Sequence, residues 1–175
     1  VSSIMTTTGY TTTDYETWPA FSKGILMMLM VIGACAGSTG GGIKVSRIMI
    51  YLNQVRKELI QQIHPRRVHV LKMDGKEIPH AMAHSCNVLL MTYVVVFIAS
   101  YLLISLDGFS IGTNFSATLA CFNNIGPGLE AVGPTCNFSA FSNLSKLVLS
   151  WAMLAGRLEI FPVLVLFSTK TWKKR

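Results

Sequence analysis

The chain has 175 residues, of which 51% are hydrophobic and only 13% are charged, and its formal net charge is +7. Soluble domains carry about 25% charged residues, so this composition excludes an ordinary soluble protein and indicates an integral membrane protein. The sequence holds no general acid–base pair, nucleophile constellation or cofactor-binding loop, and it therefore does not favour an enzyme.

Three segments are long and apolar enough to cross a bilayer, for which a helix needs about 20 residues. They run from about 19 to 44, from 85 to 106 and from 141 to 168. The middle segment has no charged residue, whereas glycines interrupt the first and Arg157 and Glu159 interrupt the third. The sequence predicts three spanning helices.

Basic residues gather in residues 44–80, which hold eight Lys and Arg against three acids, and in the C-terminal tail. Residues 1–23 and 105–146 each hold one Lys and two acids. By the positive-inside rule, residues 44–80 and the C-terminus are cytoplasmic. The basic run lacks interleaved aromatic residues and lies between two spans, so nucleic acid is not an expected partner.

The cytoplasmic segment also has local structure of its own. Apolar residues recur at helical spacing from Ile48 to Ile63, which predicts that the first helix continues to about Gln62. Pro65 would end it. The pair Asp74-Gly75 predicts a turn between two short extended pieces.

Two stretches on the outer side, about 1–15 and about 113–138, are too short or too polar to span. The second begins with the apolar segment FSATLACF, and eight to ten helical residues extend about 12–15 Å, which is half a membrane. Asn, Gly and Pro follow and would end the helix. A short helix that enters and turns back is a re-entrant pore helix, and its irregular backbone must line water or be buried in protein.

Both stretches carry a candidate ion filter. TTTGY and NNIGPG each place a glycine, Gly9 or Gly126, directly after a short run of polar or apolar residues. A row of carbonyl oxygens can replace the water shell of a cation. Aligning successive carbonyls requires some residues with positive φ, which Gly adopts at little cost. In isolation TTTGY is more typical of a plain turn; its position after a truncated pore helix and before a spanning helix favours a filter.

The order of these segments indicates an internal repeat. Residues 81–175 contain a span, a pore helix, a filter, a span and a basic tail, whereas residues 1–62 contain a filter and a span. Residues 63–80 form a cytoplasmic linker. Because the chain opens inside a motif, we expect it to be the C-terminal part of a longer protein.

The motifs SSIMTTTGY, GACAGSTGGGIKVSR, FNNIGPGLEAVGP and GRLEIFPVLVLF together resemble the Trk/Ktr/HKT superfamily of potassium-translocating subunits, most closely its bacterial TrkH type. The resemblance implies an all-α membrane fold of four span–re-entrant pore loop–span repeats around one pore. This chain would supply the end of the third repeat and all of the fourth, with one of its three spans broken by a Gly-rich intramembrane loop.

The resemblance also implies the filter residues. They are Thr7, Thr8, Gly9, Tyr10, Asn124, Ile125, Gly126 and Pro127, with transported potassium at Thr8, Gly9, Ile125 and Gly126. No covalently bound cofactor is expected. The fourth filter departs from a Gly-Tyr-Gly pattern, and a single glycine per repeat implies looser selectivity than in a dedicated potassium channel.

The glycine-rich run from Gly33 to Lys44 has more than one interpretation. A phosphate-binding loop is disfavoured, because Ile43 separates Gly42 from Lys44. The spacing of Gly33, Gly37 and Gly41 is typical of a helix-packing face. Three consecutive glycines instead favour a break in the helix, because each costs about 1 kcal/mol relative to Ala in a helix interior. Both of the latter interpretations stay open.

In the resembled family this run is a gate beneath the filter, near an intramembrane arginine. The implied gate residues are Gly37, Ser38, Thr39, Gly40, Gly41, Gly42 and Arg157. A charge within a span costs at least about 2.5–3.5 kcal/mol, so Arg157 should face the bundle interior or water. Local pairing with Glu159 or extension to the membrane interface are the alternatives for Arg157.

The predicted function is potassium transport by the pore-forming subunit of a Trk-type uptake system in the bacterial inner (plasma) membrane. A cation-coupled secondary transporter with broken helices is the alternative. The implied partners are the rest of its own four-repeat chain, a second copy in a homodimer, cytoplasmic nucleotide-binding regulatory subunits of the TrkA type, and the lipid bilayer.

Overall fold

The computed structural model describes residues 1–33, 35, 38, 40–64, 72–73, 76–77 and 79–157. The chain is mostly helical, as predicted. Its elements in chain order are α1 (Ser2–Met5), η1 (Tyr15–Thr17), α2 (Ala20–Val31), α3 (Val45–Ile63), β1 (Lys72–Met73), β2 (Lys76–Glu77), α4 (His80–Ile104), η2 (Ser105–Asp107), α5 (Ile111–Phe122), η3 (Glu130–Val132), η4 (Phe138–Ala140) and α6 (Asn143–Arg157).

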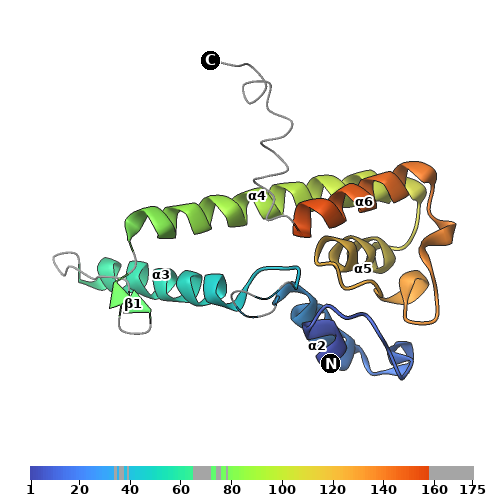
Figure 1. Ribbon diagram of the computed structural model, residues 1–175, viewed down its shortest axis with the longest axis horizontal. Coiled ribbons are helices and arrows are strands. Elements are labelled where there is room, and N and C mark those ends of the chain that lie inside the picture. Colours follow the sequence, from blue (N-terminus) through green and yellow to red (C-terminus); the bar gives the residue numbers. More distant parts are fainter. Residues whose placement is uncertain are drawn as a thin grey trace, which may run out of the picture.

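Helix α4 is the long apolar helix of the fold (Figure 1). Its 25 residues extend about 37 Å. Within the described residues it is the one helix long and apolar enough to cross a membrane, counted with η2 up to Asp107. Apolar side chains such as Met91, Val95 and Leu102 are exposed on it. An element that is apolar on all sides is typical of a protein core or a membrane span.

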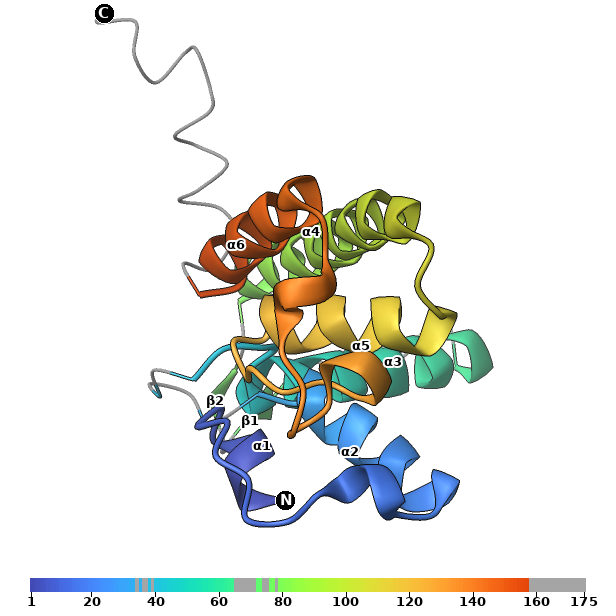
Figure 2. The same ribbon diagram turned by 90° about the vertical axis from the view of Figure 1, so that its right-hand side faces the viewer.

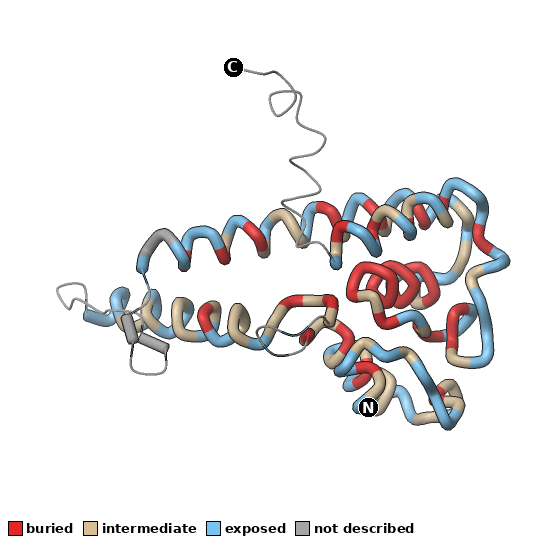
Figure 3. The backbone as a smooth tube through the Cα atoms, in the orientation of Figure 1, coloured by how far each residue is buried: buried red, intermediate tan, exposed pale blue. Residues whose placement is uncertain are grey.

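Helix α5 lies at the centre of the molecule, between the pair α4 and α6 on one side and α2 on the other (Figures 1 and 2). From Thr113 to Phe122 every residue except Phe115 is buried, and Figure 3 shows this burial along the helix. The helix begins earlier than FSATLACF because the Ser110 hydroxyl oxygen accepts a hydrogen bond from the Thr113 amide at 3.1 Å. It is a short helix of 12 residues, about 18 Å long.

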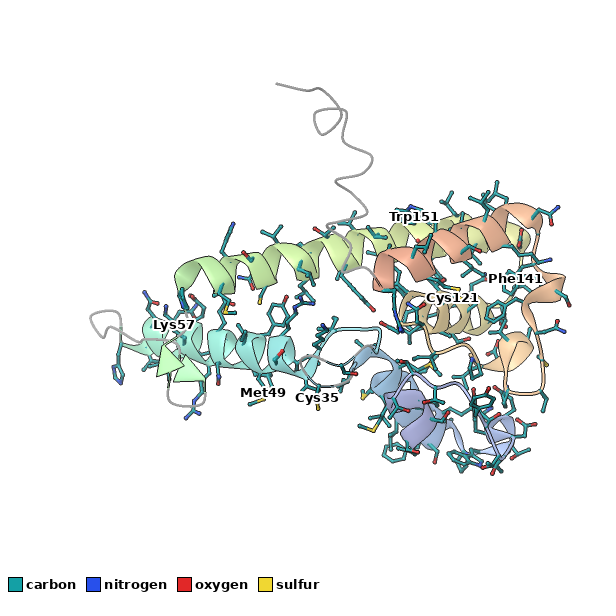
Figure 4. The ribbon with its side chains drawn as sticks, in the orientation of Figure 1. Cys35, Met49, Lys57, Cys121, Phe141 and Trp151 are labelled. Atoms are coloured by element: carbon teal, nitrogen blue, oxygen red, sulfur yellow. The ribbon has the colours of Figure 1, made fainter. Side chains whose placement is uncertain are left out.

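Helix α6 crosses the C-terminal end of α5 at very close range. A Cβ atom on Gly156 would lie 1.7 Å from the Phe122 carbonyl oxygen, so only glycine fits there. Phe122 is fully buried with Ala152 and Ala155 of α6, and Trp151 packs against them. Nearby, Cys121 shares a second buried cluster with Phe141, the residue after η4 (Figure 4). Of the predicted third span, residues 141–157 are described and form α6 from Asn143 to Arg157, whereas residues 158–168 lie outside the described residues.

The predicted first helix, which spans about 19–44 and continues to about 62, is not continuous in the structure. Helix α2 ends at Val31, before the first glycine of the run, and α3 begins at Val45. Ile32 and Ile43 form an isolated parallel bridge that closes the base of the intervening loop. Because the described glycines Gly33 and Gly40 to Gly42 are not helical, the interpretation of the run as a helix-packing face is wrong.

The basic segment between α2 and α4 has the predicted local structure in its described residues. Helix α3 ends at Ile63, one residue beyond the predicted end. Strands β1 and β2 pair antiparallel, with Lys72 opposite Glu77 and Met73 opposite Lys76. The predicted turn residues Asp74 and Gly75, and Pro65, lie outside the described residues.

We expect Gly156→Ala to lower the free energy of unfolding by about 1–3 kcal/mol, because its methyl group would overlap the Phe122 carbonyl oxygen. Gly24→Ala is the matched control: Gly24 lies inside α2 with nothing within 4 Å of its Cβ position, and alanine favours a helix by about 1 kcal/mol. Thermal denaturation of both variants in detergent measures the difference. Equal melting temperatures would contradict the close crossing of α5 and α6.

Candidate functional site

The two predicted filter segments follow two helices that end in the same backbone turn. After α1, the amides of Thr6, Thr7 and Thr8 donate to the carbonyls of Ser2, Ile4 and Ser3. After α5, the amides of Asn123, Asn124 and Ile125 donate in the same order to Leu119, Cys121 and Ala120. In each turn the second and third of these bonds run from C′ to C2 and from C″ to C3, where C′ is Thr7 or Asn124. This pair of bonds defines a Schellman motif. The predicted internal repeat therefore has a local structural counterpart.

The backbone conformations also match at equivalent positions. Thr7 and Asn124 each have left-handed φ, +53° and +56°, at the turn itself. Two residues later Gly9 and Gly126 again have positive φ, +79° and +103°. Positive φ at alternate positions is the backbone requirement for a row of carbonyls on one side of a segment. Glycine meets it without strain, whereas a β-branched residue such as Thr7 does not.

The fold brings the two segments into direct contact. A Cβ atom on Gly9 would lie 2.4 Å from the Ile125 carbonyl oxygen and 3.4 Å from Cδ of Pro127. The Cβ position of Gly126 has nothing within 4 Å, so this glycine borders open space. Tyr10 has 84% of its surface exposed and lies at the edge of the pair.

The glycine-rich loop packs against the end of α5, one residue before the second filter segment. The amide of Gly33 donates to the Ile43 carbonyl at 3.0 Å, which closes the loop at its base. At the other contact, a Cβ atom on Gly41 would lie 2.2 Å from the Asn123 carbonyl oxygen. Ser38 accepts a hydrogen bond from the Gly40 amide at 3.1 Å. Gly37 and Thr39 lie outside the described residues.

Asn123 is a buried polar residue that joins three elements at this point. Its Oδ1 accepts a hydrogen bond from the Tyr93 hydroxyl of α4 at 2.7 Å, and its Nδ2 donates to the Leu119 carbonyl at 3.0 Å. The Cβ position of Gly42 lies 3.1 Å from the same Oδ1 atom. Neither Asn123 nor Tyr93 is among the site residues predicted from the sequence. The position of Asn123, a polar residue directly after the apolar segment FSATLACF, is the sequence feature that could have identified it.

Arg157 is the last described residue of α6, and its side chain is exposed. The expectation that its charge faces the bundle interior or water stays a prediction. Within the described residues no hydrogen bond joins it to the loop. One turn earlier, the Met153 carbonyl accepts a hydrogen bond from Nδ2 of Asn124 at 3.0 Å, which ties α6 to the second filter segment.

Comparison with known proteins gives a consistent result over the whole chain. A sequence model of the TrkH family, described as a cation transport protein, matches residues 1–174. The chain is 38% identical over 174 residues to the Trk system potassium uptake protein TrkH of Escherichia coli K12, covering 99% of the chain and 36% of that protein. It is 33% identical over 172 residues to the uptake protein TrkG of the same organism, covering 98% and 35%.

A solved structure agrees with the fold. The crystal structure of the potassium transporter TrkH from Vibrio parahaemolyticus matches with a TM-score of 0.86 and 38% identity, covering 97% of this chain and 36% of that one. The chain thus spans about a third of the length of the curated relatives that it matches.

We expect Thr7→Gly to raise the free energy of unfolding by about 1 kcal/mol. Glycine removes the backbone strain of a β-branched residue in the left-handed conformation, and this gain outweighs the larger conformational entropy that glycine loses on folding. Thr8→Gly is the matched control: Thr8 has no left-handed conformation to relieve, and the change also removes a hydroxyl contact with Thr6. Thermal denaturation without potassium compares them. A loss of stability at Thr7 equal to that at Thr8 would contradict the repeated turn.

Proposed function

Because this chain belongs to the TrkH family of cation transport proteins, we propose that it supplies part of the ion-conducting pore of a potassium uptake system. Relatives of the chain are named as potassium uptake proteins, and the family is one of membrane transport proteins rather than enzymes. The observation that carries the proposal is the pair of equivalent turns, whose segments meet at Gly9 and Ile125.

The filter is formed by Thr7 to Tyr10 and Asn124 to Pro127, and dehydrated potassium binds at Thr8, Gly9, Ile125 and Gly126. Two further features support this assignment. The C-terminal end of α5 points its partial negative charge toward the start of the second segment, which favours a cation there. Gly126 also borders open space, as a residue along an ion path must.

The membrane arrangement follows from the helices and the charges. Helices α4 and α6 cross the bacterial inner membrane, α5 is the re-entrant pore helix, and α2 reaches half-way before the glycine-rich loop. Residues 44–80 and the C-terminus lie in the cytoplasm because most of the basic residues are there. The exposed apolar side chains of α4 then face lipid or the remaining repeats of a four-repeat polypeptide.

The loop between Ile32 and Ile43, together with Arg157, acts as the gate. The loop packs against Asn123 through backbone contact, and within the described residues no hydrogen bond joins it to α5. It can therefore leave this position without breaking a polar contact among these residues. Arg157 is exposed near the end of α6 and repels cations while the gate is closed.

The cytoplasmic face binds regulatory subunits of the nucleotide-binding TrkA type, and a second copy of the full protein forms a homodimer with the first. Helix α3 supports a cytoplasmic contact, because its later turns carry Arg56 and Lys57 beside exposed Val55 and Leu59. Figure 4 shows Met49 earlier on this helix, on the side that faces away from α4.

The filter assignment is tested with Gly126→Ser and Gly9→Ser in the full-length protein. Both side chains disturb a backbone that needs positive φ, so the ratio of K⁺ to Na⁺ flux should fall about tenfold or more. Flux into proteoliposomes, normalised to the amount of inserted protein, measures the ratio. Unchanged ratios in both variants would remove the filter assignment.

The gate assignment is tested by deleting Gly37 to Gly42 and, separately, by Arg157→Ala. Each change removes part of the obstruction, so the resting K⁺ flux should rise rather than disappear. Gly41→Ala is a milder version, because its methyl group would overlap the Asn123 carbonyl oxygen and displace the docked loop. If well-expressed variants of all three kinds keep the resting flux and regulation of the parent protein, the gate lies elsewhere.

A further inference from the structure

A short turn after the first filter segment contacts the backbone just beyond the second. The turn is η1, from Tyr15 to Thr17, and Asp14 caps it by accepting a hydrogen bond from the Glu16 amide at 2.9 Å. Tyr15 has only 4% of its surface exposed, and its hydroxyl donates to the Gly128 carbonyl at 2.9 Å. The Glu16 Oε1 atom accepts from the Glu130 amide at 2.7 Å.

These two bonds are the only hydrogen bonds between residues 1–31 and residues 111–142 among the described residues. Every other hydrogen bond of residues 128–132 to the described residues lies within their own repeat. The Gly128 amide donates to Val132, and the Leu129 amide donates to the Ser116 hydroxyl of α5. Those bonds fix the segment on its own pore helix. Between the two repeats, the packing of Gly9 on Ile125 brings the filter segments together, and the two bonds from η1 are the polar contacts that add to it.

The contact is held firmly on both sides. The second carboxylate oxygen of Glu16 pairs with Lys23 of α2 at 2.9 Å, so Glu16 is bound to its own repeat. Glu130 has a left-handed φ of +57°, and its carboxylate accepts hydrogen bonds from Ser110 and, at 2.9 Å, from Thr113 at the start of α5. A continuous series of bonds therefore runs from α2 to the N-terminal end of the pore helix.

The protonation states suit these roles. Burial, with smaller contributions from Glu16 and Asp14, raises the pKa of Tyr15 to about 12, so its hydroxyl stays a donor at neutral pH. Hydrogen bonds from Ser110 and Thr113 lower the pKa of Glu130, so its carboxylate stays ionised.

We propose that Tyr15 and Glu16 are positioning residues for ion selectivity, which set the spacing between the two filter segments by holding Gly128 and Glu130. The proposal rests on the filter assignment above. The arrangement of the carbonyls around a cation contributes to its selection, and hydrogen bonds between the repeats restrict that arrangement more narrowly than packing alone. We call this pair of bonds the outer clamp.

The test uses Tyr15→Phe, Glu16→Ala and Glu16→Gln in the full-length protein. Tyr15→Phe removes the donor to Gly128 and keeps the ring, and Glu16→Ala removes the acceptor for Glu130. Each should lower the ratio of K⁺ to Na⁺ flux by up to about tenfold, the factor that corresponds to one hydrogen bond. Glu16→Gln should keep the ratio within about twofold, because its amide oxygen still accepts from the Glu130 amide.

Tyr101→Phe is the matched control, because the Tyr101 ring packs on Phe115 and its hydroxyl makes no hydrogen bond to the described residues. It should leave the ratio unchanged. Flux per inserted protein and the melting temperature are measured for every variant. If Glu16→Ala does not reach the membrane, Tyr15→Phe alone decides.

Three results would overturn the outer clamp. If Glu16→Gln loses selectivity as Glu16→Ala does, charge at the outer mouth matters and not the bond. If Tyr15→Phe and Glu16→Ala both keep the parent ratio while Gly126→Ser lowers it, the filter assignment stands and the clamp fails. If Gly126→Ser also keeps the parent ratio, the filter assignment fails and the clamp fails with it.

Discussion

The end of α5 inside the protein is the constraint on which the rest of the structure depends. A helix that stops at a buried position leaves carbonyl groups without helical partners, and here it does so where three other segments meet. Three glycines lie close to backbone carbonyls at this end or just beyond it: Gly156 of α6 at Phe122, Gly41 of the loop at Asn123, and Gly9 at Ile125. A side chain at any of these three positions would force two backbone segments apart. The end of one helix therefore requires glycine at one position in each of three distant segments.

The sequence predicts those parts of the fold that depend on local patterns. The uncharged run of α4, the helical spacing that continues to Ile63, and the turn glycines Gly9 and Gly126 all follow from hydropathy, periodicity and backbone preference. The break after α2 was expected at the glycines, but the helix ends at Val31, because the bridge of Ile32 to Ile43 begins the loop before the first glycine.

Other features depend on contacts between residues far apart in the chain, and no local pattern encodes them. Asn123 and Tyr93 are 30 residues apart, and Tyr15 lies 113 residues from its acceptor Gly128. Nothing within α6 itself requires glycine at position 156. The requirement arises because the end of α5 packs against this position. The sequence predicts candidate filter residues and a candidate gate loop, but it does not predict the residues that hold these segments in place.

The two sides of the filter segments are held by different physical means. Beyond the second segment, the backbone is held by a hydrogen bond that Tyr15 donates and by bonds that Glu16 and Ser116 accept. On the other side, the glycine-rich loop meets Asn123 through close packing, and its hydrogen bonds among the described residues lie within the loop or at its base. Breaking a buried hydrogen bond leaves a donor or an acceptor unpaired, which costs free energy. A segment held by packing alone does not pay this cost when it moves away. This difference in bonding is the one that the proposed filter and gate require, since the first must stay in place and the second must move.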